Sequence, residues 1–282
     1  MKSRRIMSGI ITTVFLTSSV MIPGSMVFAD SSVRVDEKNF PDENFRKYIC
    51  TFDNNSDGVL DEKEISEVHF IQCDDMDIES LKGIEFFPKT YAVTCRSNRI
   101  SEIDLSKNPE LGVLYCDYNQ IYDLDLSKNT ELTELQCSNN YIANLDVSNL
   151  PKLKLLYCEV NQIKSLKMGS KESLQELDCS SNKLAELDLS DASNLQNLFC
   201  RSNELTTLDL SNCHKLEYVE SSFNKLTSVD LGANKALQFL NVSQNQLKAI
   251  DITNAKDLIE LNISYVCGSC NPMPFIKRYI IV

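Results

Sequence analysis

Apolar and polar positions along this chain repeat with a period of 21 residues. Each unit reads approximately L-x-x-L-x-C-x-x-N-x-L-x-x-L-D-L-S-x-x-x-x, after a 22-residue forerunner that begins at Val68. A fixed period of this length is typical of a solenoid, in which each coil packs only on its neighbours. We therefore predict one short parallel strand per coil, formed by L-x-x-L-x-C. The coils begin at Thr90, Leu111, Leu132, Leu153, Leu174, Leu195, Leu216, Leu237 and Leu258.

Two further columns of the repeat predict how each coil closes. Asp-Leu-Ser recurs late in the coil, first at residues 104–106, and favours a short second strand over a helix. Asparagine side chains can satisfy turn amides, so we expect the ninth column to stabilise a turn after each strand. That column holds Asn98, Asn119, Asn140, Asn161, Asn182, Asn203, Asn224 and Asn245.

With these columns the sequence resembles the leucine-rich repeat family, and more narrowly its bacterial internalin-like members of the irregular L-D-L type. The resemblance covers roughly residues 68 to 266. It implies a leucine-rich repeat solenoid that is mostly β, with a parallel concave sheet, short convex strands or turns, and little helix. The chain departs from the family in having Cys for the usual Leu at the sixth position. In the fourth coil, Lys167, Met168 and Gly169 also replace Asp-Leu-Ser.

Seven cysteines occupy the sixth column, two residues after an inward leucine or its equivalent, and are therefore predicted to point inward. The same column continues as Ser221, Val242 and Ile263, which indicates that the position requires a side chain of suitable size and not the chemistry of a thiol. Neighbouring strands lie about 4.8 Å apart, whereas a disulfide prefers Cβ atoms about 3.8 Å apart and zinc needs four converging ligands. We predict buried free thiols, with some disulfides or a metal or redox role as alternatives. The column is Cys73, Cys95, Cys116, Cys137, Cys158, Cys179 and Cys200.

Residues 53 to 64, DNNSDGVLDEKE, fit the EF-hand loop at every defining position. We predict that calcium is a cofactor and that it stabilises an EF-hand-like, helical N-terminal cap over residues 30–67, which covers the first coil. The alternative is an acidic turn that holds no metal, since a lone EF-hand lacks its usual partner. The motif implies the ligands Asp53, Asn55, Asp57, Val59 through its carbonyl, Asp61 and Glu64.

The third, fifth and eighth columns are expected to face the concave surface. Aromatic residues gather there in two groups, with acidic residues between them, and exposed aromatic residues favour an interface. The alternative is that aromatic residues merely suit strands. The predicted ligand-binding face comprises Tyr115, Tyr118, Leu155, Tyr157, Phe199, Tyr218, Phe223 and Phe239.

These features predict a recognition module that binds a protein ligand on a host or bacterial surface. A structural component of the cell surface without a discrete ligand, and a carbohydrate-binding module, are the alternatives. We do not expect an enzyme, because the two histidines, His69 and His214, lie beside no nucleophile constellation. We also expect a monomer.

The first 29 residues predict a secretory signal peptide: Lys2, Arg4 and Arg5 precede an apolar stretch that ends near Ala29. Its removal takes the formal net charge of the chain from −12 to −15. Such an acidic chain argues against a nucleic-acid partner, and no second apolar run is long enough for membrane insertion. We therefore expect a secreted, extracellular protein or one associated with the cell surface.

The tail over residues 267–282 contains Cys267 and Cys270 in a C-x-x-C arrangement, followed by an apolar end. A small disulfide, free thiols and a redox pair are all consistent with that spacing, and the first two are favoured because no thioredoxin-like context is present. The apolar end is expected to cover the final coil. The solenoid itself is assigned to residues 68–266.

Overall fold

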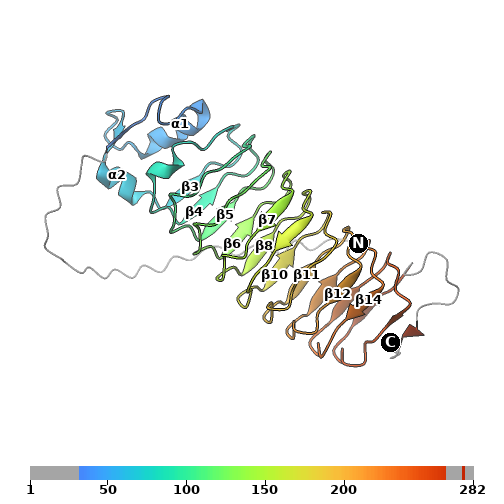
Figure 1. Cartoon of the computed structure of the whole chain (residues 1–282). Coiled ribbons are helices and arrows are strands. Elements are labelled where there is room, and N and C mark those ends of the chain that lie inside the picture. The colour runs from blue at the N-terminus through green and yellow to red at the C-terminus, as the bar shows by residue number, and fades with distance from the viewer. Residues whose placement is uncertain (1–31, 265–274, 277–282) are drawn as a thin grey trace, which may run out of the picture. The chain divides into compact units, whose positions relative to one another are not determined.

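The computed structural model describes residues 32–264 and 275–276 (Figure 1). The predicted signal peptide and the Cys267 and Cys270 pair lie outside the described residues. Each coil of the repeat contributes one three-residue strand to a parallel sheet, as the 21-residue period predicts.

The main sheet has ten strands, and its register follows the sequence columns, since Leu135 pairs with Leu156 and Leu156 with Leu177. The predicted mostly β solenoid is confirmed. In spatial order the strands are β3 (Phe70–Gln72), β4 (Ala92–Thr94), β5 (Val113–Tyr115), β6 (Glu134–Gln136), β8 (Leu155–Tyr157), β10 (Glu176–Asp178), β11 (Asn197–Phe199), β13 (Tyr218–Glu220), β15 (Phe239–Asn241) and β17 (Glu260–Asn262).

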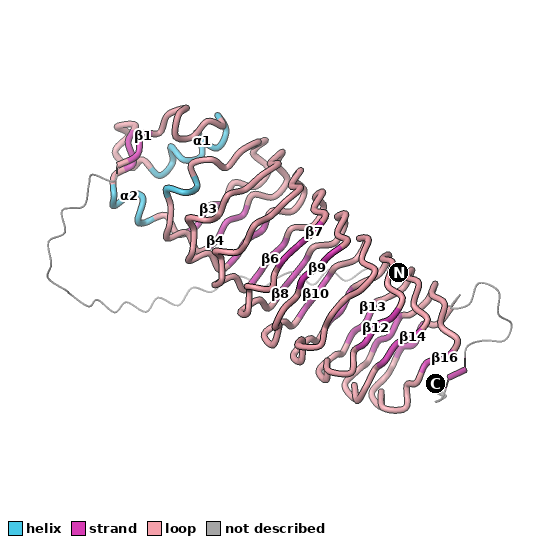
Figure 2. Tube along the Cα trace, viewed as in Figure 1, coloured by secondary structure: helices cyan, strands magenta, loops and turns pink. Residues whose placement is uncertain are grey.

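Short parallel strand pairs, not helices, form the opposite side of several coils (Figure 2). Strands β12 and β7 end at the aspartate that begins the corner of the coil, and this aspartate accepts a hydrogen bond from the backbone two residues later, as in Ser211 N to Asp209 Oδ1 at 2.9 Å. The pairs are β7 (Asn144–Asp146) with β9 (Ser165–Lys167), β12 (Thr207–Asp209) with β14 (Ser228–Asp230), and β16 (Ala249–Ile250) with β18 (Phe275–Ile276).

Helical structure in the described residues is confined to the N-terminal part. The apolar residues Phe45 and Ile49 of α1 are fully buried and belong to the same hydrophobic cluster as the leucine columns. The Tyr48 hydroxyl accepts a hydrogen bond from the Gln72 amide at 2.7 Å, so α1 covers the first edge of the main sheet. The elements are β1 (Val33–Arg34), α1 (Glu43–Ile49), η1 (Cys50–Phe52), β2 (Val59–Leu60), α2 (Glu62–Glu67) and η2 (Ile84–Phe86).

The asparagine column links each coil to the preceding one. Asn140 is 5% exposed; its Oδ1 accepts from the Ile121 amide at 2.9 Å and its Nδ2 donates to the carbonyls of Cys116 at 3.0 Å and Cys137 at 3.1 Å. Asn119 and the later members repeat the pattern. The expectation that this column satisfies turn amides is confirmed.

Candidate ligand-binding face and calcium loop

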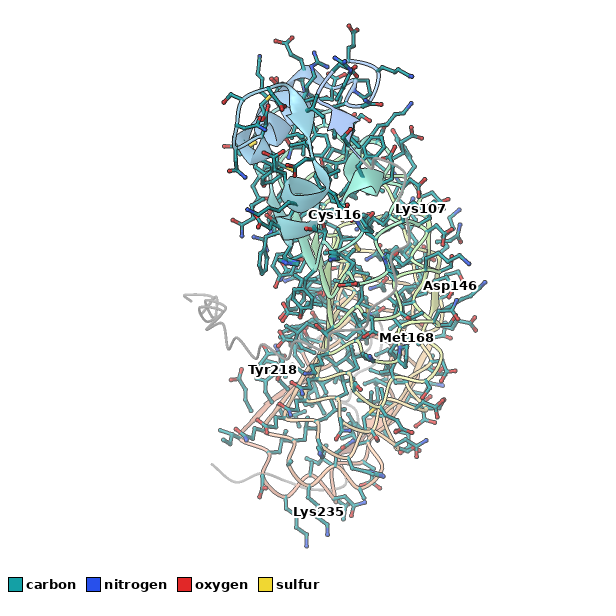
Figure 3. The ribbon with its side chains drawn as sticks, turned by 90° about the vertical axis from the view of Figure 1, so that its left-hand side faces the viewer. Lys107, Cys116, Asp146, Met168, Tyr218 and Lys235 are labelled. Atoms are coloured by element: carbon teal, nitrogen blue, oxygen red, sulfur yellow. The ribbon has the colours of Figure 1, made fainter. Side chains whose placement is uncertain are left out.

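The outward side chains of the ten-stranded sheet form a continuous surface, which we call the sheet face. On strands such as β8 and β13 the middle residue is buried and its two neighbours are half-buried, because successive side chains of a strand point to opposite sides. Figure 3 shows Tyr218 on this face and Asp146 on the other side of the stack, with Cys116 between them. The third and fifth columns therefore form the outward-facing rows of the sheet, and Leu155 is one of their half-buried members.

One aromatic group lies on β5 and its neighbours. The guanidinium carbon of Arg96 lies 4.3 Å from the Tyr115 ring centroid, and Arg96 also contacts Asp117 at 3.2 Å and Gln136 at 2.9 Å. The Tyr115 hydroxyl donates to Glu134. Burial and this carboxylate raise the pKa of Tyr115, so its hydroxyl stays protonated at neutral pH. This part of the sheet face is a fixed network of charged and aromatic groups.

Tyr157 lies two strands from Tyr115, on β8, and its hydroxyl pairs with Glu176 of the next coil. Burial and the Glu176 carboxylate raise the pKa of Tyr157 as well. The same arrangement, a tyrosine paired with the carboxylate of the following coil, thus occurs twice on the sheet face.

The second aromatic group is a stack of three rings on β11, β13 and β15. The centroids of Phe199 and Tyr218 lie 5.0 Å apart, and those of Tyr218 and Phe239 lie 4.2 Å apart with the rings within 4° of parallel. All three side chains are half-buried. Beside the stack, Asn241 donates to Glu220 at 2.8 Å. The sequence grouped these aromatics by column, and the structure brings the three rings into contact.

Sequence reasoning placed acidic residues, including Glu159, among the aromatics of this face but did not recognise the seventh column as a source of charge. This column holds Arg96, Asp117 and Glu159, each two residues after the end of a strand. Asp117 accepts from the Ser138 amide at 2.9 Å, and Glu159 accepts from the Ser138 hydroxyl. Burial raises the pKa of both carboxyls. The recurrence of charged residues at one column was the available signal.

Asp178 on β10 is another partly buried carboxylate of the sheet face, and burial raises its pKa. Between the ordinary and the raised pKa the folded chain binds more protons than the unfolded chain, so this group's contribution to stability falls as pH rises through that window. Asp178→Asn should therefore raise the melting temperature at about pH 7, by on the order of 2 °C. The hydrogen bond from Ser180 N survives, because Asn241 accepts the equivalent bond from Ser243 at 3.0 Å.

Thermal unfolding of wild type and Asp178→Asn at about pH 7 and about pH 3.5 checks this sign. The difference should shrink at the lower pH, where Asp178 is protonated. An equal gain at both values would show that the charge of Asp178 is not its source.

The eighth column lies in the turn after each strand, outside the strands themselves. Its residues have positive φ, including Tyr118 at 56°, Val160 at 57° and Phe223 at 55°. These three side chains are 57%, 48% and 53% exposed. A bulky or β-branched residue in the left-handed region is an unusual and costly choice. In other coils the same place is taken by small or polar residues such as Asn139, with φ of 55°, and Ser181.

Relief of this strain gives a second prediction. Val160→Asn should raise the melting temperature by about 2–4 °C, since asparagine tolerates the left-handed region and a non-glycine residue there costs about 1–2 kcal/mol. The reciprocal change, Asn139→Val, should lower it by a similar amount. Calorimetry on both variants tests the pair, and a Val160→Asn variant less stable than wild type would contradict this reading of the turn.

The predicted calcium loop has its residues in EF-hand order. Gly58, at the sixth position, has φ of 79°, and its amide donates to Asp53 at 2.8 Å. Glu64 is 6% exposed, and its two carboxylate oxygens accept from the amides of Asn54 at 2.8 Å and Asp61 at 3.0 Å. Asp61 in turn caps α2 through the Glu64 amide.

Oxygen donors of the kind calcium prefers therefore line this loop, at Asp53, Asn55, Asp57 and Glu64. Their oxygens accept loop amides, and within residues 32–264 no three His, Cys, Asp or Glu side chains form a group that could hold a metal. The donors thus match an EF-hand in chemical type and in sequence order, while their oxygens bond to loop amides in this structure. The loop also has a strand partner that the sequence did not reveal, because β2 pairs antiparallel with β1.

The seven cysteines of the sixth column are all fully buried and free. Burial raises the pKa of their thiols, to about 12 for Cys73. A buried thiol with a high pKa is a poor nucleophile, so these side chains act as small apolar fillers of the core. Cys50, outside the column, is exposed and also free.

A hollow of the described surface lies away from the aromatic groups. It has a volume of about 670 Å³, faces the opposite side of the coils and is lined by residues that include Asp209, Asp230 and Gly232. A similar hollow of about 330 Å³ lies between Asp125 and Asp146. Because the hollow recurs with the repeat, it reflects coil geometry and not a particular site.

Comparisons with known proteins agree with this architecture. Residues 173–198 and 204–233 match the Leucine Rich Repeat family model, and no curated protein matches the chain. The chain is similar to the functional domain of InlJ from Listeria monocytogenes, which includes a cysteine ladder, with 30% identity and a TM-score of 0.63. That match covers 83% of this chain and only 57% of the InlJ domain.

Two other solved structures show the same fold. Internalin C2 of Listeria monocytogenes has 16% identity and a TM-score of 0.62, over 85% of this chain and 100% of that chain. A leucine-rich repeat protein of Leptospira interrogans has 19% identity and a TM-score of 0.58, over 72% of this chain and 62% of that chain. The described residues thus form a leucine-rich repeat solenoid. None of their helices has the length and apolar character needed to cross a bilayer.

Proposed function

We propose that this chain is a secreted or cell-surface bacterial protein that recognises a protein ligand through the sheet face. The observation that carries the proposal is the ring stack of Phe199, Tyr218 and Phe239, with centroids 5.0 and 4.2 Å apart. The rings are fixed on adjacent strands of one rigid sheet, so a partner would order few additional side chains on binding. Aromatic residues of this kind dominate the energetics of protein interfaces.

The charges around the stack suggest the chemistry of the partner. Glu220 and Glu260 lie on strands at either side of Phe239, and the whole chain has a sequence pI of about 4.7. A complementary partner would present a basic or mixed-charge surface. The similarity in fold to InlJ and internalin C2 supports a bacterial interaction module and assigns no reaction to the chain.

Calcium in the 53–64 loop is the second part of the proposal. Its donor set is that of an EF-hand, and the strand of the loop is already paired with β1. Bound calcium would join Asp53 to Glu64 and so fix α2 against η1 and the start of the solenoid. Its role would be to stabilise the N-terminal cap.

Capture from bacterial and host cell-surface extracts tests the recognition proposal. The full chain should retain a specific protein, and the triple variant Phe199→Ala, Tyr218→Ala, Phe239→Ala should bind that protein at least 100-fold more weakly. Asp188→Ala, on the opposite side, is the matched control and should bind as wild type does. If the triple variant retains the same protein with unchanged affinity, or if no protein is captured, the sheet face is not a protein-recognition surface.

A further inference from the structure

A second exposed surface lies beside the sheet face, along the segment that follows each strand. In this segment the ninth and eleventh columns are buried, whereas the eighth, tenth and twelfth point outward. Adjacent coils are held in register here by backbone hydrogen bonds, such as Tyr141 N to Ile121 O at 2.9 Å and Gln162 N to Ile142 O at 3.0 Å. We call the outward side chains of these three columns the rim.

Exposed aromatic and apolar side chains gather on the rim of the coils that begin at Leu111, Leu132 and Leu153. Tyr118, Tyr122, Tyr141 and Val160 are 57%, 62%, 44% and 48% exposed. The rings of Tyr122 and Tyr141 come from successive coils and stack, with centroids 5.2 Å apart and planes 22° apart. Exposed clusters of this kind on a folded surface commonly mark a binding site.

Hydrogen bonding within the described residues does not explain these side chains. Among the described residues no hydrogen bond is made by the hydroxyls of Tyr118, Tyr122 or Tyr141. Tyr118 and Val160 occupy the left-handed turn position, where the smaller Asn139 and Ser181 fit at lower cost. At Tyr118 and Val160 the chain therefore keeps bulky, exposed side chains at a position where they reduce stability.

In two of these three coils the rim columns carry no charge, whereas the coil that begins at Leu153 has Lys164 there. In the coils that begin at Leu111 and Leu132 the three rim columns hold Tyr118, Gln120, Tyr122, Asn139, Tyr141 and Ala143, with no charge. Every other complete coil has at least one Lys, Arg or Glu in these columns. In this chain 24% of the residues are charged, so the absence of charged residues from the rim columns of two successive coils is distinctive.

We infer that this patch binds a short neutral glycan. An aromatic ring presents a weakly negative face to which the C–H groups of a sugar ring are attracted, and Gln120 and Asn139 offer amide donors and acceptors for sugar hydroxyls. Two coils span only about 10 Å, which is small for a protein interface of about 800 Å² per partner. This site is separate from the sheet face and does not depend on it.

Saturation-transfer NMR with neutral hexasaccharides of glucose, mannose, galactose or N-acetylglucosamine tests the inference on the full chain. At least one should bind, and Tyr122→Ala with Tyr141→Ala should weaken it at least tenfold. Tyr122→Phe with Tyr141→Phe, which keeps both rings, should retain affinity within about threefold, and Tyr218→Ala on the sheet face should bind as wild type does. Because both rim tyrosines are exposed, their loss should leave the melting temperature within about 2 °C of wild type.

Three outcomes would overturn this assignment. The first is that no neutral hexasaccharide binds. The second is that an anionic hexagalacturonate binds as tightly as the best neutral sugar, which would remove the argument from charge. The third is that the alanine pair abolishes capture of a protein from the extracts while sugar binding is unchanged, which would make the rim a protein interface.

Discussion

Asn140→Ala should lower the melting temperature by about 8–12 °C, a loss also expected for the equivalent members of the asparagine column. Asn140 is 5% exposed, and its amide group serves four backbone partners in two coils, which are Ile121, Cys116, Cys137 and Ser138. Each buried group left without a partner costs about 1–3 kcal/mol, and a cost of about 3–4 kcal/mol corresponds to this shift in a chain of this size.

The matched control for this prediction is Asn149→Ala. Asn149 is an exposed residue of the same coil, and its loss should change the melting temperature by no more than about 2 °C. Hydrogen exchange adds a local readout, because the Ile121 amide should lose protection in Asn140→Ala before the rest of the stack does. If Asn140→Ala and Asn149→Ala have the same melting temperature, the asparagine column does not hold the coils together.

The second large effect is expected from calcium. Wild type should gain about 5–10 °C in melting temperature when calcium reaches about 100 times its dissociation constant, which corresponds to about 2.7 kcal/mol. The double variant Asp53→Ala, Glu64→Ala should show no calcium-dependent gain. Glu64 also caps α2, so the variant should be less stable even without calcium. The informative quantity is therefore the increment on adding calcium.

Glu67→Ala is the control for the calcium experiment, because Glu67 is an exposed acid of α2 outside the loop motif. It should keep the full calcium increment, and magnesium should give a smaller one, since it demands a tighter octahedral shell. An increment of wild-type size in the Asp53→Ala, Glu64→Ala variant would remove the calcium site from this loop.

The repeat architecture could be predicted from the sequence because a fixed period sets the register. Once Leu135 and Leu156 share a column, stacking places them side by side, and the observed pairing is the predicted one. The asparagine bonds follow for the same reason, since each links a coil to the one before it. In such a structure, residues that are one period apart in the sequence lie next to each other in neighbouring coils.

Contacts that depend on the direction of a side chain or on turn geometry could not be predicted. The column spacing does not reveal that residues of the eighth column have positive φ. The backbone strain at Val160 could therefore not be predicted from the sequence. The stack of Tyr122 on Tyr141 joins the twelfth column of one coil to the tenth of the next, a pairing that no single column shows. Arg96 over Tyr115 likewise depends on how a long side chain folds back across the strands.

The pairing of β1 with the calcium loop is a third example. Val33 and Arg34 precede their partners in β2 by more than twenty residues and have no repeat to define their register. The loop can be recognised from the spacing of its own residues. That spacing contains no information about a strand partner from outside the motif. The contacts of the non-repeating segments are therefore the ones that the sequence predicts least and the structure reveals most.

Hydroxyl-radical footprinting of the complex with the captured protein tests the central claim most directly. The chain has ten tyrosines, and they report on different surfaces. Binding should protect Phe199, Tyr218 and Phe239 on the sheet face and leave Tyr122 and Tyr141 on the rim as reactive as in the free chain. Protection confined to the rim or to the short strands of the opposite side, with Tyr218 unchanged, would contradict recognition through the sheet face.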